Sequence, residues 1–108
     1  MFISIEDFYK KASECKPFSK EEEKVLATLM DGGDEIAKEK LTKSYFNYVA
    51  STIKRLAKEM QTLTLVYNCL NALEKSVETF NFMQDSESFS HRLTFVLRKE
   101  ITAYVANL

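Results

Sequence analysis

Basic and aromatic side chains recur together along the second half of this chain, and this combination could bind nucleic acid. Lysine and arginine neutralise phosphates, while flat aromatic side chains stack on bases. The cations that could contact phosphates are Lys54, Arg55, Lys58, Arg98 and Lys99, and the aromatic candidates are Phe89, Phe95 and Tyr104. The cations could instead form the solvated side of two helices. Aromatic residues at helical spacing are more often core residues, which is the interpretation favoured for Phe95.

The other reactive residue types show no pattern of a catalytic or metal site. His91 has no second ligand nearby in the sequence, which is typical of a surface histidine. Cys15 and Cys69 lie far apart without a C-x-x-C spacing, so we expect two reduced thiols. Glu21–Glu23 resemble paired carboxylates, but the helix dipole explains acids in a first turn. Without a nucleophile elbow, phosphate loop or metal signature, we expect no enzyme, cofactor, metal or small-molecule substrate.

Length and composition bound the class of protein. The 108 residues suit one compact domain, and their formal net charge is −1. A near-neutral domain is not expected to have a strong general affinity for nucleic acid, which normally needs a basic face. Two glycines and one proline leave few turns, so long helices are expected. Because the N-terminus has no signal-peptide pattern and no apolar run approaches the roughly 20 residues that span a bilayer, we expect a cytoplasmic protein without a membrane segment.

Capping patterns divide the N-terminal third into two helices. Ser4 with Asp7 can cap the first helix, which ends before the proline of the chain. The apolar face of the first helix is Ile5, Phe8, Tyr9 and Ala12. The second helix begins at the capping box Ser19 with Glu22 and ends at the two adjacent glycines. Its expected inward face is Val25, Leu26, Leu29 and Met30.

Three longer helices are expected after Asp34, which can cap the first of them. Their apolar positions repeat at intervals of three and four residues. These positions are Leu41, Tyr45, Val49, Ile53, Leu56 and Met60; then Leu63, Val66, Leu70, Leu73, Val77 and Phe80; then Phe89, Leu93, Val96, Leu97, Ile101, Tyr104 and Val105. Residues 81–88 are polar and form the expected flexible loop. The predicted fold class is all-α, a compact helical bundle of about five helices with short connections.

Five landmarks resemble, in order and spacing, region 2 of the sigma-70 family of bacterial transcription initiation factors. That family has G-D-x-x-A-x-x-x-L, a helix ending near K-R, then V-E-K-F-D, F-S, and a helix with R-Q-x-I-T. The corresponding segments are GDEIAKEKL (33–41), VASTIKRL (49–56), VETFN (77–81), FS (89–90) and RKEIT (98–102). The resemblance implies a single sigma region 2-like helical domain over residues 1–108, with N-terminal helices in 1–32 and the region 2-like core in 33–108.

The family normally continues into a helix-turn-helix domain that reads promoter DNA. The sequence ends before any such domain. The resemblance therefore implies either a separate helix-turn-helix subunit as a partner or a sequence that is a piece of a longer protein.

The resemblance assigns protein docking to residues 64–81, TLVYNCLNALEKSVETFN. They align with the family's helix that binds the clamp helices of the polymerase β′ subunit. The apolar seam and the terminal V-E-x-F are retained, whereas polar docking residues of the family are replaced. The implied contacts to core RNA polymerase, or to another protein with a differently shaped surface, are Thr64, Tyr67, Asn68 and Asn71.

The resemblance assigns promoter DNA to residues 89–102, FSHRLTFVLRKEIT. The implied DNA contacts are Phe89, Arg92, Phe95, Arg98, Lys99 and Thr102. Arg92 stands where the family has the aromatic residue that traps a flipped adenine, and Phe95 and Val96 stand at its tryptophan pair. Because stacking on flat aromatic side chains offsets the cost of base flipping, these replacements predict weak DNA binding with little promoter opening.

Two other functions remain open beside a sigma-like initiation subunit or co-subunit. One is a sigma-derived protein-interaction module that no longer binds DNA, which the near-neutral charge and the lost aromatic residues favour. The other is a regulator that occupies the polymerase clamp and blocks other sigma factors. The retained Arg98, Thr102 and Phe89-Ser90 favour the transcription factor.

Overall fold

The computed structural model describes residues 1–107, which form six α-helices and one short 3-10 helix. The helices are α1 (Ile5–Ser13), α2 (Lys20–Asp31), α3 (Glu35–Ser44), α4 (Phe46–Ala57), α5 (Leu63–Thr79) and α6 (Phe89–Ala106), with η1 (Lys58–Met60) directly after α4. The described residues contain no strand. The predicted all-α bundle is therefore confirmed.

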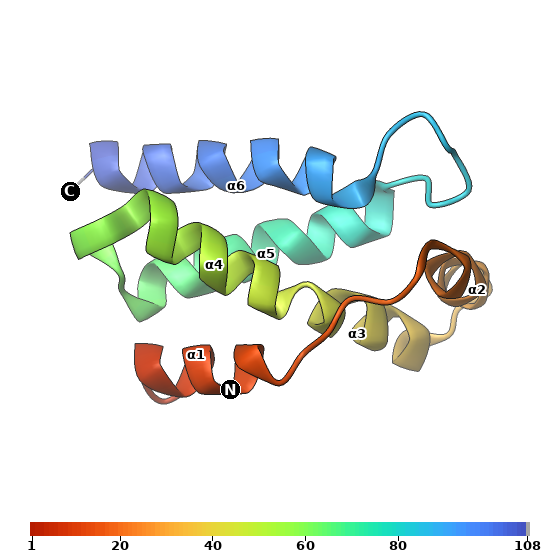
Figure 1. Ribbon diagram of the computed structural model, residues 1–108, viewed down its shortest axis with the longest axis horizontal. Helices are drawn as coiled ribbons and strands as arrows, with labels where there is room; N and C mark the ends of the chain where they lie inside the picture. The colour runs from red at the N-terminus through yellow and green to blue at the C-terminus, as the bar shows by residue number, and fades with distance from the viewer. Residues whose placement is uncertain (108) are drawn as a thin grey trace.

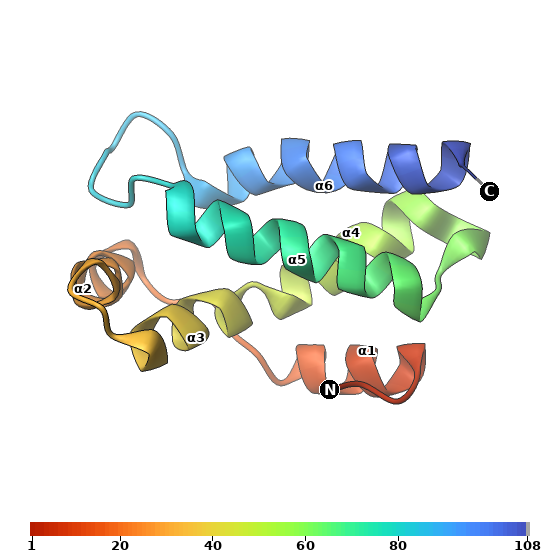
Figure 2. The same ribbon diagram turned by 180° about the vertical axis from the view of Figure 1, so that it is seen from behind.

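The centre of the bundle is formed by α4, α5 and α6 (Figure 1). Helix α1 packs on α4, and α2 packs mainly on α3 at one end of the molecule. Helix α4 lies nearest the viewer in Figure 1, whereas α5 lies nearest the viewer from behind in Figure 2. These two helices therefore present their outer faces on opposite sides of the bundle, and α6 packs along both.

One continuous core joins the helices. Its largest fully buried side chains include Phe8, Leu41, Ile53, Leu65, Leu73, Leu93 and Leu97. Removing such side chains from water is the main contribution to the stability of the fold. None of the helices in residues 1–107 combines the length and the apolar character that crossing a bilayer requires.

The predicted helix starts are confirmed, because side chains satisfy the free backbone N–H groups there. Ser4 Oγ accepts the N–H three residues on at 3.0 Å. Ser19 Oγ accepts from the Glu22 N–H at 3.2 Å, and the Glu22 carboxylate accepts from the Ser19 N–H at 2.9 Å. Asp34 Oδ1 accepts two N–H groups, at 3.0 and 3.1 Å, in the first turn of α3. The chain reaches Asp34 through Gly33, whose φ of +96° favours glycine.

The expected helix through Leu41, Tyr45 and Val49 is divided in two at Tyr45. The Ser44 hydroxyl donates to the Leu41 carbonyl at 2.6 Å, and the Tyr45 N–H bonds to a carbonyl three residues back rather than four. These local bonds compete with the regular helical pattern and end α3. Lys58 then ends α4 with φ +48°, so Met60 lies in η1 and is 40% exposed rather than in the core.

The inward face expected for α2 is wrong at two positions. Val25 and Leu29 are 61% and 47% exposed, whereas Leu26 and Met30 pack against the core and Ala27 is buried. Because α2 rests mainly on α3, only a narrow strip of this helix is covered. Apolar residues at 25, 26, 29 and 30 fit more than one helical stripe, and the sequence pattern cannot choose between the stripes.

Candidate functional site

The outer face of α5 carries the four predicted protein contacts. Thr64 and Asn71 are exposed, and Tyr67 and Asn68 are half-buried. Their spacing of three and four residues places all four on one side of the helix, away from its buried side chains. Thr62 caps the start of helix α5, and its hydroxyl accepts from the Leu65 N–H at 3.2 Å. The face is thus a continuous polar surface on a regular helix.

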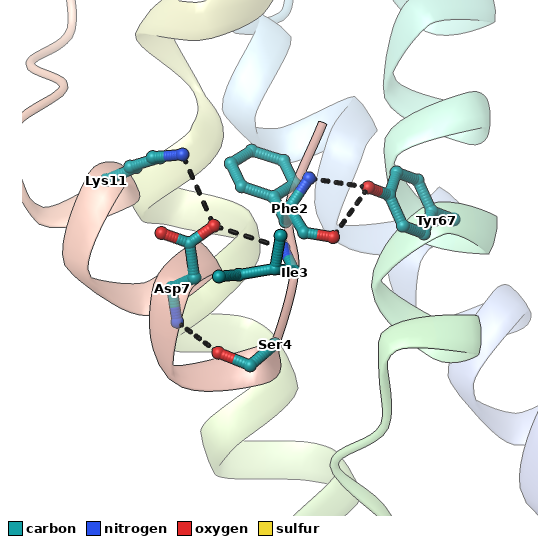
Figure 3. A network of polar contacts seen from close by, with 6 residues as sticks. All are labelled: Phe2, Ile3, Ser4, Asp7, Lys11 and Tyr67. Carbon is teal, nitrogen blue, oxygen red and sulfur yellow. Dashed lines mark hydrogen bonds and ion pairs between the residues drawn. The ribbon is translucent and has the colours of Figure 1, made fainter.

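Tyr67 is less available than the sequence suggested. Its hydroxyl accepts a hydrogen bond from the Phe2 N–H at 2.8 Å and donates to the Phe2 carbonyl at 3.4 Å (Figure 3). The contact joins residues 65 positions apart, so no local sequence pattern could have revealed it. Phe2 of the N-terminal segment therefore lies against the α5 face at Tyr67.

The acidic residues at the edge of this face are paired. Lys38 of α3 contacts Glu74 at 3.3 Å and Glu78 at 2.8 Å. Hydrogen bonding to Glu78 is the largest cause that raises the pKa of Lys38 above its ordinary value. These contacts tie α3 to α5 and leave little free negative charge beside Asn71.

The outer face of α6 presents most of the predicted DNA contacts to solvent. Arg92, Phe95, Lys99 and Thr102 are exposed at a spacing of three and four residues, which places them on one side of the helix. Phe95 is 60% exposed, so the favoured interpretation of it as a core residue is wrong. Its ring packs only edge-on against His91, with ring centroids 5.3 Å apart. A large apolar ring on an exposed cationic helix face is available for stacking.

Phe89 cannot serve as a DNA contact in this structure, because it is only 3% exposed. Its ring lies in a cluster with the rings of Tyr45, Phe80 and Phe82, at centroid distances of 4.7, 5.2 and 5.2 Å. The residue at the start of α6 therefore holds the helix in place, and the predicted role of Phe89 in stacking on a base is corrected to a packing role.

The expected polar, flexible loop of residues 81–88 is anchored at Phe82, which is 5% exposed. Asp85 at the loop tip lies 2.8 Å from Lys20 and 3.4 Å from Lys24 of α2. Hydrogen bonds from Lys20 are the largest cause that lowers the pKa of Asp85. Phe82 thus holds the loop against the aromatic cluster, and Asp85 holds it against α2. The polar composition of residues 81–88 did not indicate that one of their side chains, Phe82, is buried.

Arg92 is already engaged by an acidic side chain. Its Nε and Nη2 atoms lie 3.2 and 2.9 Å from the two carboxylate oxygens of Glu87. The hydrogen bond to Arg92 lowers the pKa of Glu87 below its ordinary value. Arg92 would have to give up this two-fold contact before its guanidinium could meet a phosphate or a base.

A groove between α4 and α6 has an unpaired cation in its lining. The groove is lined by Leu56, Arg98, Ile101, Thr102, Val105 and Ala106. The ion pairs within residues 1–107 do not include Arg55, Lys58, Arg98 or Lys99. The surface therefore combines an apolar floor with uncompensated positive charge, as a surface that follows a phosphate backbone would. Of the predicted phosphate contacts, Arg98 lines the groove, whereas Arg55 is not among its lining residues.

One predicted cation and one predicted aromatic residue have other partners. Lys54 Nζ lies 4.4 Å from the ring centroid of Tyr9, so its charge is directed toward α1. The hydroxyls of Tyr104 and Thr62 lie 2.7 Å apart and join α6 to the start of α5. Tyr104 therefore supports the bundle, with its hydroxyl bonded to Thr62 and its ring partly buried against the core.

Comparisons with known proteins add no assignment. No protein-family model matches the chain, and no solved structure matches it. Within residues 1–107, no three His, Cys, Asp or Glu side chains come together as a group of metal ligands would.

Proposed function

We propose that this protein is a sigma-like subunit or co-subunit of bacterial transcription initiation. In this proposal the protein works in the cytoplasm, is not an enzyme, binds core RNA polymerase through α5 and engages promoter DNA weakly through α6 and α4. The proposal rests on the order of the five sequence landmarks. The observation that supports it best is the separation of two different surfaces: a polar face at Thr64, Asn68 and Asn71 on α5, and a cationic face with an exposed ring on α6 and α4.

The separation matters because a two-sided adaptor needs surfaces that two large partners can reach at the same time. Thr64, Asn68 and Asn71 face one side, where amides and a hydroxyl can exchange hydrogen bonds with a protein. Arg98 lines the groove between α4 and α6, and Arg55 and Lys58 lie in the last turn of α4 and directly after it, where positive charge suits DNA. Because the formal net charge is only −1 and Arg92 is held by Glu87, the DNA affinity expected is weak and sensitive to salt.

The proposal is tested by the affinity of purified core RNA polymerase for labelled protein, measured by fluorescence anisotropy. Changing Asn68 and Asn71 together to alanine should weaken binding about tenfold, because truncated interface residues commonly contribute about 1–2 kcal/mol. Asn47→Ala on α4 removes the same exposed amide elsewhere and is the matched control. Loss of affinity in both variants, or in neither, would contradict the assignment of α5.

A second function is favoured by a specific observation. Burial of Phe89 and the Arg92–Glu87 contact reduce the residues available for DNA, which favours a protein-interaction module without DNA binding. Polymerase binding that survives with no salt-sensitive affinity for promoter DNA would select this alternative over the initiation subunit.

A further inference from the structure

The N-terminal residues form a strap that ends on the proposed polymerase-binding face. Phe2 inserts its ring between α1 and α5, with centroids 5.0 Å from Phe8, 6.1 Å from Phe46 and 6.2 Å from Tyr67. The residues on either side of Phe2 contribute almost nothing to this packing, since Met1 is 101% and Ile3 is 87% exposed. One side chain therefore anchors the strap.

Two sets of backbone hydrogen bonds complete the attachment (Figure 3). The Phe2 peptide unit exchanges two bonds with the Tyr67 hydroxyl. The Ile3 N–H donates to Asp7 Oδ2 at 3.1 Å, and Lys11 Nζ reaches the same oxygen at 3.2 Å. The bond from Ile3 is the largest cause that lowers the pKa of the Asp7 carboxyl. The strap is thus held by a small set of contacts, each of which can be removed singly.

We propose that residues 1–3 are a releasable strap that occupies Tyr67 and competes with the protein partner of α5. The inference rests on the proposed function, since the partner is the one that docks on Thr64, Asn68 and Asn71. A tyrosine hydroxyl has a single proton to donate, and Phe2 accepts it here. A partner that accepts the proton of this hydroxyl, or that fills the space of the Phe2 ring, must first displace Phe2.

The surface exposed by release defines the kind of partner segment that fits. Without Phe2, the rings of Phe8, Phe46 and Tyr67 line an aromatic site beside a free hydroxyl. An extended partner segment that carries one aromatic side chain can replace the Phe2 ring and its two backbone bonds. If only the released form binds, the apparent affinity falls in proportion to the fraction of molecules in that form.

The test compares the affinity of core RNA polymerase for three forms of the full chain. Phe2→Ala removes the anchor and should bind at least fivefold more tightly than the wild type. Ile3→Ala shortens an exposed side chain but keeps its N–H, and should bind like the wild type. Circular dichroism confirms that each variant is folded. If Phe2→Ala is not folded, Ile3→Pro serves instead, because it removes the N–H that donates to Asp7 Oδ2 and restricts the backbone of Phe2. This variant should also bind more tightly.

The possible results distinguish a failure of the strap inference from a failure of the proposed docking role of α5. Unchanged affinity in the folded Phe2→Ala variant would show that Tyr67 is not used by the partner. Weaker binding would show that the strap is a contact and not a competitor. Either result overturns the inference while leaving the proposed function intact if the Asn68 and Asn71 variant still loses affinity. Absence of polymerase binding in every form, the wild type included, would overturn both.

Discussion

The Tyr45 hydroxyl donates a hydrogen bond to the Glu23 carboxylate and thereby links the break between α3 and α4 to the first turn of α2. Tyr45 is only 8% exposed, and burial, followed by the bond to Glu23, raises the pKa of its hydroxyl. Burial is also the largest cause that raises the pKa of Glu23. The sequence placed Glu23 among acids explained by the helix dipole, whereas in the structure it has a specific partner from another helix.

Tyr45→Phe should lower the free energy of unfolding by about 1–3 kcal/mol at pH 7, because it leaves a half-buried carboxylate without its donor. The pKa of Tyr45 is raised in the folded state, so its stabilising effect is present below the unfolded value of about pH 10 and is lost as pH rises above it. Urea unfolding between pH 7 and 11 measures both effects. If the free energy of unfolding of Tyr45→Phe falls above pH 10 as steeply as that of the wild type, a group other than Tyr45 causes the loss of stability at alkaline pH.

Phe82→Ala should lower the free energy of unfolding by about 3–5 kcal/mol, the usual cost of removing a buried phenylalanine. The cause is the space left against the rings of Phe80 and Phe89. Met83→Ala, at the neighbouring exposed position, is the control and should change stability by less than about 0.5 kcal/mol. Equal effects in chemical denaturation would contradict the anchoring role of Phe82.

Cys69 should resist thiol reagents in the folded protein while Cys15 reacts. Cys69 is fully buried, and burial raises the pKa of its thiol to about 12, so the reactive thiolate is scarce at pH 8. Cys15 is partly exposed. Labelling with a chromogenic disulfide reagent at pH 8 should therefore modify one thiol per chain without denaturant and two in concentrated urea. Rapid modification of both thiols without urea would show that the core opens readily.

Phe95→Ala should weaken binding to single-stranded DNA by about tenfold, since stacking on an aromatic side chain contributes about 1–3 kcal/mol per base. Val25→Ala, at an equally exposed apolar position on α2, is the control. Fluorescence anisotropy at two salt concentrations measures the affinities. If both variants bind as the wild type does, the exposed ring of Phe95 has no part in DNA binding.

The helix starts were predictable because a cap depends on residues three positions apart, as at Ser4, Ser19 and Asp34. The all-α class followed from periodicity for the same local reason. Phe89 and Phe95 were each given both a core role and a DNA-binding role, because a helix rich in apolar residues on several sides fits more than one buried stripe. Only the structure shows that Phe89 is buried and Phe95 exposed. The contacts Phe2–Tyr67 and Glu23–Tyr45 join distant segments, so only the assembled bundle reveals them.

Lys58 shows how a binding surface and a stable fold can make opposing demands on one residue. Its φ of +48° costs a residue other than glycine about 1–2 kcal/mol, yet the position carries a cation that takes part in none of the ion pairs of residues 1–107. Lys58→Gly should therefore raise the free energy of unfolding by about 1 kcal/mol while lowering the DNA affinity and its salt dependence. Denaturation and anisotropy on the same variant measure both sides of this trade-off. Gain of stability without loss of affinity would remove Lys58 from the proposed DNA surface. With both changes present, the strained turn after α4 would be a compromise in which a positive charge is kept at the expense of folding stability.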